Sequence, residues 1–195
     1  MYWDEANIDH RELTARERQR LTWMMASLSL PKGGVRAAFA DEMACVYRFA
    51  AVRWPEGPTC ADCGRKDFAY LKMRKCLYCR KCKRQLSVTA GTIAHRSRLD
   101  LRMWFIAAED VISAYAIGKE DAFLTGHDLA HRYGVSYSAA HRLKTRLLAD
   151  LSDPKGIIKP SICVAEPNVP QDVAEFDWGL FVWAQAKVTG YFFGD

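Results

Sequence analysis

The chain has no long uninterrupted run of apolar residues, although 50% of its 195 residues are hydrophobic. A membrane-spanning helix needs roughly 20 predominantly apolar residues in succession, so we expect no membrane partner. The first residues, MYWDEANIDH, also lack the basic start and the apolar run of a signal peptide. These absences, together with closely spaced cysteines that suit free thiols, indicate a protein of the reducing cytoplasm.

Net charge is also small, +5 for the whole chain, but it is distributed unevenly. Residues 57–98 carry eleven basic side chains against two acidic ones, a net charge of +9, whereas residues 1–56 are neutral. A small module with that charge density suits the phosphates of nucleic acid, since each neutralised phosphate releases counterions. A basic surface that is merely solvated is the alternative.

Two Cys-x-x-Cys pairs lie inside this basic segment. They are Cys60/Cys63 and Cys79/Cys82, with fifteen residues between them. Two such knuckles place four thiolates around one zinc ion, which is the closed four-ligand arrangement of a structural site. The sequence therefore predicts one structural Zn²⁺ bound by these four cysteines, and residues 57–98 are expected to form a zinc ribbon.

Spacing alone does not define the second pair, because Cys76 forms a further Cys-x-x-Cys with Cys79. We prefer Cys79/Cys82, because the chain then leads from the knuckle directly into a predicted strand. Cys76 would in that case be a buried or half-exposed thiol, and its replacement of a ligand stays open at this point. The strands are predicted at 68–73 and 85–89, where residues alternate or are β-branched.

Helical patterns precede the ribbon. Residues 11–28 contain a capping box, Thr14 followed by Glu17, and a second helix is predicted from Val35 to about Val52. We therefore expect residues 1–56 to form N-terminal helices that pack against the ribbon.

After the ribbon, residues 99–151 have the pattern of a helix-turn-helix unit. A first helix is predicted from Leu101 to about Tyr115. Thr125 then caps a second helix that Gly134 closes in a left-handed turn, and Ser136 caps the third helix. An ordinary helical hairpin is the alternative, but the neighbouring basic ribbon favours a DNA-binding unit.

The third helix would present a polar and basic face outward. In the DNA-binding interpretation, its first turns reach base edges, while its later turns and the basic residues of the ribbon lie near phosphates. The predicted base contacts are Tyr137, Ser138, His141 and Arg142, and the predicted phosphate contacts are Lys144, Thr145 and Arg146 with Lys81, Lys83, Arg84, Arg96 and Arg98.

The last part of the chain, residues 152–195, follows a different pattern. Prolines interrupt its first half, so residues 157–174 are predicted to be an extended linker or an arm lying on the domain. The final stretch, EFDWGLFVWAQAKVTGYFFGD, is rich in aromatic side chains, unlike a disordered tail. It either packs back onto the domain or offers a surface to a partner, such as RNA polymerase or a second copy of the chain.

Taken together, the patterns predict an α+β protein: a four-cysteine zinc ribbon flanked by N-terminal helices and followed by a three-helix helix-turn-helix unit and an aromatic C-terminal segment. In their order, several segments resemble the N-terminal DNA-binding region of bacterial insertion-sequence transposases that begin with a zinc ribbon. The likeness covers residues 39–151 and rests on Phe39-Ala-Asp-Glu, Arg53-Trp54-Pro55-Glu56-Gly57, both knuckles, the segment QLSVTAGT from Gln85 to Thr92, and Trp104-Phe105.

The resemblance implies that Cys60, Cys63, Cys79 and Cys82 bind zinc and that the module recognises double-stranded DNA at the ends of the mobile element. It also implies a bacterial protein associated with the nucleoid.

The chain departs from this family beyond Leu151. Such transposases continue into an RNase H-like domain, whose three carboxylates hold two metal ions for phosphodiester transfer. Only 44 residues follow Leu151, fewer than the roughly one hundred that such a domain needs, and the family's Val-Asp-Glu-Thr segment is missing. Asp172, Glu175 and Asp177 are close in sequence, but we interpret them as solvated surface. We therefore expect no enzymatic activity.

These observations favour a DNA-binding transcription regulator that reuses a transposase end-binding module. One alternative is an elongation or antitermination factor that associates with RNA polymerase. The other is a catalytically incomplete transposase.

Overall fold

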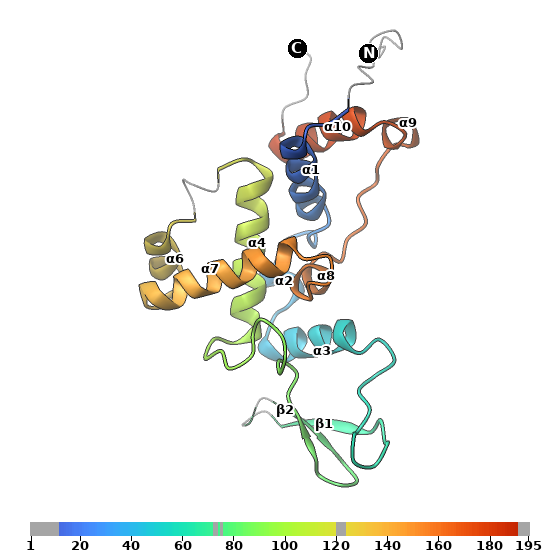
Figure 1. The fold of residues 1–195 in the computed structure, drawn as a ribbon, viewed down its shortest axis with the longest axis vertical. Helices are drawn as coiled ribbons and strands as arrows, with labels where there is room; N and C mark the ends of the chain where they lie inside the picture. Colours follow the sequence, from blue (N-terminus) through green and yellow to red (C-terminus); the bar gives the residue numbers. More distant parts are fainter. Residues whose placement is uncertain (1–11, 72–73, 75, 120–123, 191–195) are drawn as a thin grey trace.

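A computed structural model describes residues 12–71, 74, 76–119 and 124–190 (Figure 1). The fold is mostly helical, with a small antiparallel sheet at one end of the molecule, so the predicted α+β class is confirmed. Among the helices of the described ranges, none has the length and apolarity that crossing a membrane requires.

The sheet has three strands in the order β1-β2-β3, namely β1 Phe68–Leu71, β2 Cys76–Cys79 and β3 Gln85–Leu86. The segments predicted at 68–73 and 85–89 contain the outer strands. The central strand β2 was not predicted. Four residues that begin and end with cysteine are too few to show the alternation by which strands are recognised.

The strand predicted at 85–89 ends early, at Leu86. Beyond it the hydroxyl groups of the segment bond to the local backbone: Ser87 Oγ accepts from Ala90 N at 3.1 Å, and Thr92 Oγ1 donates to Thr89 O at 2.8 Å. Such bonds favour turns over a strand ladder. The chain leaves the sheet here in a series of turns.

The helix predicted from Val35 to Val52 is two helices, α2 Val35–Ala38 and α3 Glu42–Arg53. Asp41 takes the N-cap position between them, and its carboxylate accepts a hydrogen bond from Ala44 N at 2.8 Å. The single-helix prediction was wrong because an aspartate cap inside a periodic apolar pattern begins a new helix.

Helix α1, Ala15–Leu28, begins with the predicted capping box between Thr14 and Glu17. It packs against α4, Leu101–Ala116, which runs through the centre of the molecule (Figure 1). The N-terminus of α4 is held by Glu42 of α3, whose carboxylate accepts hydrogen bonds from the first amides of α4 at 3.0 and 2.8 Å. Buried α4 side chains that form the core include Trp104, Phe105, Ala108, Val111 and Ile112.

Helices α6, Gly126–Tyr133, and α7, Tyr137–Ser152, form a pair that packs together and against α4. Thr125 and Ser136 cap their N-termini as predicted, and Gly134 ends α6 in the left-handed conformation with φ +63°. The tight turn between the two helices therefore follows from one glycine and one serine cap.

Residues 157–174, predicted to be an extended linker, contain two short helices, α8 Ile158–Ile162 and α9 Gln171–Ala174. Helix α8 packs against α3, α4 and α7, and its first amides donate to the buried carboxylate of Asp150. Pro160 is tolerated because the amides of a first helical turn have no intrahelical acceptor. Of the two forms predicted for this segment, an extended linker is wrong for α8, whereas an arm lying on the domain agrees with the packing of this helix.

Helix α10, Asp177–Thr189, contains much of the aromatic C-terminal stretch and packs against α1 (Figure 1). Phe181 and Ala184 are buried in this contact, and the rings of Trp178 and Phe181 stack at 5.5 Å. Of the two interpretations left open by the sequence, packing back onto the domain applies to this helix. The aromatic residues at 191–193 lie outside the described residues.

Candidate metal centre and nucleic-acid interface

The four knuckle cysteines converge on one point. The Sγ atoms of Cys60, Cys63, Cys79 and Cys82 all lie within 4.8 Å of one another. The Cys60 and Cys82 sulfurs are 3.4 Å apart, and the Cys63 and Cys79 sulfurs are 3.5 Å apart. A tetrahedral zinc site with Zn–S bonds of about 2.3 Å has sulfur–sulfur distances of about 3.8 Å. The cluster could therefore hold one metal ion, and its position beside the strands is consistent with a zinc ribbon.

Both knuckles have the same backbone turn. In the first, Gly64 N donates to Cys60 O at 2.9 Å, and in the second, Lys83 N donates to Cys79 O at 2.9 Å. Gly64 and Lys83 both adopt left-handed conformations, with φ +66° and +63°. This repeated geometry identifies Cys79/Cys82 as the second knuckle.

Cys76 lies outside the four-sulfur cluster. It belongs to β2, where residues three apart point to opposite faces, so Cys76 and Cys79 cannot face the same ion. Its thiol donates to Gln85 Oε1 at 3.7 Å, and burial raises the pKa of the thiol. Cys76 therefore does not take the place of one of the four cysteines in the cluster.

The electrostatics of the cluster suit a bound cation. The backbone N–H of Cys82 donates to the Cys79 sulfur and lowers the pKa of that thiol to about 7. The backbone N–H of Arg84 likewise lowers the pKa of the Cys82 thiol. The neighbouring cysteine sulfurs outweigh this effect and raise that pKa to about 12. Four thiolates at these distances repel one another, so all of them ionise only around a positive ion.

The predicted phosphate contacts of the ribbon, Lys81, Lys83 and Arg84, are all exposed. Arg84 lies 2.5 Å from Asp62 in a solvent-exposed ion pair, and Lys83 Nζ lies 5.7 Å from the centre of the Tyr78 ring. Exposed ion pairs contribute little free energy, so Arg84 can exchange its carboxylate partner for a phosphate.

A half-buried arginine that was not among the predicted site residues joins the ribbon to the helices. Arg53, at the end of α3, donates to Val88 O at 2.6 Å and to Ala90 O at 2.5 Å, and it lies 4.6 Å over the Trp54 ring. Burial lowers its pKa. The Arg-Trp-Pro and QLSVTAGT segments on which the resemblance rests are thus in direct contact.

The outward face of α7 carries the residues predicted to contact DNA. The helix is held in place by Ala140, Leu143 and Leu147, all of which are buried. The exposed residues of the predicted interface are Tyr137, Ser138, His141, Arg142, Thr145 and Arg146.

Tyr137 is 50% exposed and sits among aromatic neighbours. Its ring lies 4.8 Å from the ring of His127 in α6 and 6.2 Å from that of His141. Gly126 makes room for it, since a Cβ there would lie 2.5 Å from Cε2 of Tyr137. His127 was missed by the sequence prediction, because nothing in the spacing shows that α6 places it against α7.

Two of the predicted phosphate contacts donate hydrogen bonds to backbone carbonyl groups of the protein itself. Lys144 Nζ donates to Leu124 O at 2.7 Å and is only half-exposed, and Arg146 donates to Ile93 O at 3.2 Å. These bonds fix α7 against the chain before α6 and against the chain after the sheet. Lys144 therefore serves the fold rather than the outer face.

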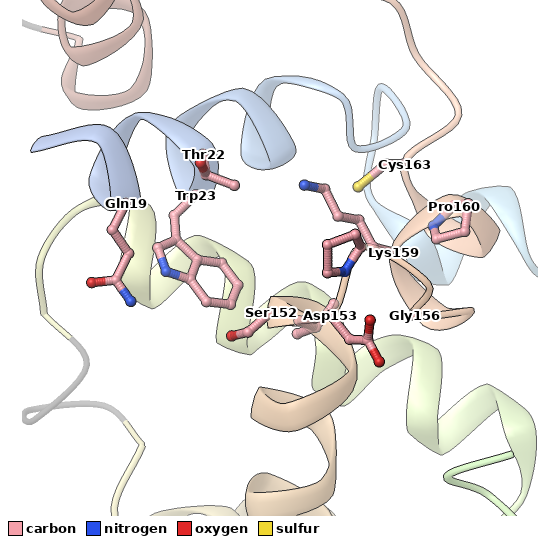
Figure 2. Close-up of a pocket in the computed structure, with 11 residues that line it drawn as sticks. Gln19, Thr22, Trp23, Ser152, Asp153, Gly156, Lys159, Pro160 and Cys163 are labelled. Atoms are coloured by element: carbon pink, nitrogen blue, oxygen red, sulfur yellow. The ribbon is translucent and has the colours of Figure 1, made fainter. Parts of the chain in front are cut away.

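A groove of about 650 Å³ lies elsewhere, between α1, the C-terminal end of α7 and α8 (Figure 2). Trp23, Lys159 and Cys163 are among its lining residues. No residue of the predicted metal or DNA site lines it.

The acidic residues Asp172, Glu175 and Asp177 are exposed on α9 and at the start of α10. Within the part of the chain that the structure describes, the four cysteines are the sole group of three or more potential metal ligands that converge.

Comparison with known protein families finds no match for the chain. No curated protein matches it, and no solved structure does. The resemblance to zinc-ribbon transposases thus rests on the sequence segments alone.

Proposed function

We propose that this protein is a DNA-binding transcription regulator in which a zinc ribbon and the α6–α7 pair bind double-stranded DNA together. The observation that carries the proposal is the polar and basic outer face of α7. This face stands on a helix that buried residues hold in place, the basic side chains of the ribbon are exposed, and Arg146 of α7 bonds to Ile93 O in the chain that leaves the ribbon. A rigid helix with such a face suits the major groove, and the ribbon suits the adjoining phosphates.

Zinc is the metal that the cysteine cluster fits best. Thiolates are soft ligands, and a tetrahedral set of four is typical of zinc or of iron–sulfur centres. The ion would fix the two knuckles to each other and so hold the ribbon's basic residues in place. Its role is structural, because all four tetrahedral positions are taken by protein ligands.

The metal assignment is tested by elemental analysis of the purified chain. We expect one zinc ion per chain, and we expect the Cys63→Ser variant to lose it. Cys76→Ser is the matched control and should keep its zinc, since Cys76 faces Gln85 instead of the cluster. Retention of zinc by the first variant, or its loss by the second, would contradict this ligand set.

In the DNA complex, the first two turns of α7 would lie in the major groove. Arg142 has the length and charge to bond a guanine edge through two donors, and Ser138 is adjacent on the same face. Tyr137 would contribute its exposed ring edge, held by His127 and His141. Lys81 and Lys83 would neutralise phosphates.

We assign regulation instead of strand cleavage because of the ligand chemistry. Phosphodiester transfer uses carboxylates that hold two metal ions. Among the described residues, the converging ligands are thiolates, while the carboxylates of α9 and α10 stay apart. Helix α10 uses its buried side chains against α1, so this part of the aromatic segment is already occupied within the fold.

The DNA proposal is tested by selecting duplexes from a random library with the zinc-loaded chain and measuring their binding. Arg142→Ala should weaken binding of the selected duplex by about 1–3 kcal/mol and relax the preference at one position. Arg36→Ala, an exposed arginine on α2, is the control and should bind as the wild type does. Binding that depends on salt but not on sequence, or no binding, would overturn the proposal.

A further inference from the structure

The chain that leaves the ribbon forms a cationic turn at residues 95–98, His-Arg-Ser-Arg, which we name the exit turn. His95, Arg96 and Arg98 are all exposed there. Arg96 has a φ of +56°, a left-handed conformation that strains a residue with a Cβ. Neither arginine makes an ion pair with another residue that the structure describes.

The exit turn is fixed to the core by the serine between the two arginines. Ser97 Oγ accepts hydrogen bonds from Leu99 N at 3.0 Å and from Trp104 Nε1 at 3.2 Å. Trp104 is fully packed in the core. Because Ser97 faces inward, the arginines on either side of it are held facing the solvent.

The exit turn is also tied to α7. Arg146 of α7 donates to Ile93 O, just before the turn, and Figure 1 shows this part of the chain beneath α7 and beside the start of α4. Arg146 follows Tyr137 by nine residues, which is about 13 Å along a helix. The exit turn therefore belongs to the same face of the molecule as the exposed side of α7.

We propose that Arg96 and Arg98 enter the DNA minor groove next to the major groove that α7 occupies, and that they select A·T-rich sequence there. This inference rests on the proposed DNA binding. Adjacent major and minor grooves lie about half a helical turn apart, roughly 17 Å, and the Arg146–Ile93 bond joins the exit turn to the helix proposed for the major groove.

The chemistry of the exit turn favours the minor groove over phosphates. A·T-rich DNA has a narrow minor groove with an enhanced negative potential, and arginine enters it readily because its guanidinium is weakly hydrated. The basic residues of the exit turn are arginines, whereas the ribbon surface mixes lysine and arginine. A rigid turn also inserts two side chains without first losing conformational freedom.

The test uses a duplex selected by the zinc-loaded chain, with the base pairs flanking the α7 site varied. Inosine·cytosine pairs present the minor-groove pattern of A·T and the major-groove pattern of G·C. We expect A·T and inosine·cytosine flanks to bind equally, and G·C flanks to bind about tenfold more weakly. Equal binding of all three flanks, or an inosine·cytosine flank that behaves like G·C, would overturn the inference.

Three variants test whether this preference belongs to the exit turn. Arg96→Ala/Arg98→Ala should bind all three flanks equally, while Lys81→Ala, which removes a proposed phosphate contact of the ribbon, should weaken binding to all three by the same factor. Arg96→Gly guards against unfolding, because glycine adopts a positive φ without strain and should still lose part of the flank preference. Failure of the wild type to bind any duplex would instead refute the proposed function itself.

Discussion

At the scale of single residues, Lys83 stands where the first knuckle has a glycine. Its φ of +63° strains a residue with a side chain, whereas Gly64 with φ +66° is unstrained. The presence of lysine at this position is explained if its charge contributes to the proposed DNA binding at a cost in folding stability.

We therefore predict that Lys83→Gly leaves the free energy of unfolding unchanged or raises it by up to about 1 kcal/mol. DNA affinity should fall, and the slope of log affinity against log salt should decrease by about one. Urea unfolding of the zinc-loaded chain and titrations at several salt concentrations measure both quantities. Lower stability together with unchanged affinity would contradict this explanation of Lys83.

Gly126 lies against Tyr137 of the proposed DNA interface, so the size of the residue at this position matters. A Cβ there would lie 2.5 Å from the ring of Tyr137, so Gly126→Ala must displace that ring. Alanine gains about 1 kcal/mol of helix propensity over glycine, so we expect little change in stability but weaker DNA binding.

A double-mutant cycle checks this prediction. Gly126→Ala should weaken binding in the wild-type background and have no further effect in a Tyr137→Ala background. Equal effects in both backgrounds would show that Gly126 acts through something other than Tyr137.

The four candidate metal ligands were predictable from sequence, whereas the hydrogen bonds that cationic side chains make within the protein were not. The repeated Cys-x-x-Cys spacing identifies Cys60, Cys63, Cys79 and Cys82, and the structure brings these four sulfurs together. Lys144 also looks like a phosphate contact by its place on the helix. Its bond to Leu124 O depends on how the chain enters α6, which no local pattern reveals.

At the scale of elements, α8 depends on one buried carboxylate. Asp150 accepts hydrogen bonds from Ile157 N at 3.2 Å and from Ile158 N at 2.8 Å. Asp150→Ala should lower the free energy of unfolding by about 1–3 kcal/mol, because two partly buried amides lose their acceptor. Urea unfolding measures this change in free energy. Asp153→Ala, in the exposed turn that follows α7, is the control and should change the free energy of unfolding less.

The same carboxylate gives a pH dependence. Burial raises the pKa of Asp150 above its ordinary value of 3.8, and the amides of Ile158 and Ile157 partly oppose the shift. The folded chain thus holds this proton more tightly than the unfolded chain. The stability that it contributes is complete below the ordinary pKa and declines as pH rises through the raised one.

Relative to the wild type, Asp150→Asn should therefore become more stable as pH rises above the ordinary pKa of 3.8, and level off once pH has passed the raised pKa. The difference between the two unfolding free energies is the quantity to measure, since it cancels effects of acid on the metal site. A difference that stays constant with pH would contradict the raised pKa.

Elements were predictable where their signals are local. The caps Thr14, Thr125 and Ser136 and the turn at Gly134 all occupy the positions that the sequence indicated. The start of α2 at Val35 was predicted, although the contact that holds it was not: Val35 N donates to the carboxylate of Glu109 in α4 at 2.8 Å. Contacts between segments far apart in sequence also decide the docking of α8 and α10.

At the scale of the whole molecule, the two ends differ in what stabilises them. The ribbon has short strands and few buried apolar side chains besides Leu77, while α4 lies in an extensive core. A domain with so small a core depends on its metal.

Removal of zinc with a strong chelator should therefore unfold the ribbon and leave the helices intact. We expect the helical circular-dichroism signal to be largely retained, protease cleavage to appear within residues 60–84, and DNA binding to be lost. Restoring zinc should reverse all three changes. Loss of the helical signal on chelation would show that the helical core also needs the metal.

Glu42 joins α3 to the start of α4, and Arg53 joins α3 to the chain leaving the ribbon. Because α7 packs against α4, the helices fix the ribbon and α7 relative to each other, and in the proposed DNA complex they would fix the spacing between the two footprints on the duplex. Inserting a single base pair between their two footprints would rotate one footprint by about 35° around the duplex, given 10–10.5 base pairs per turn. We therefore expect the proposed complex to tolerate sequence changes in its target far better than changes in the target's length.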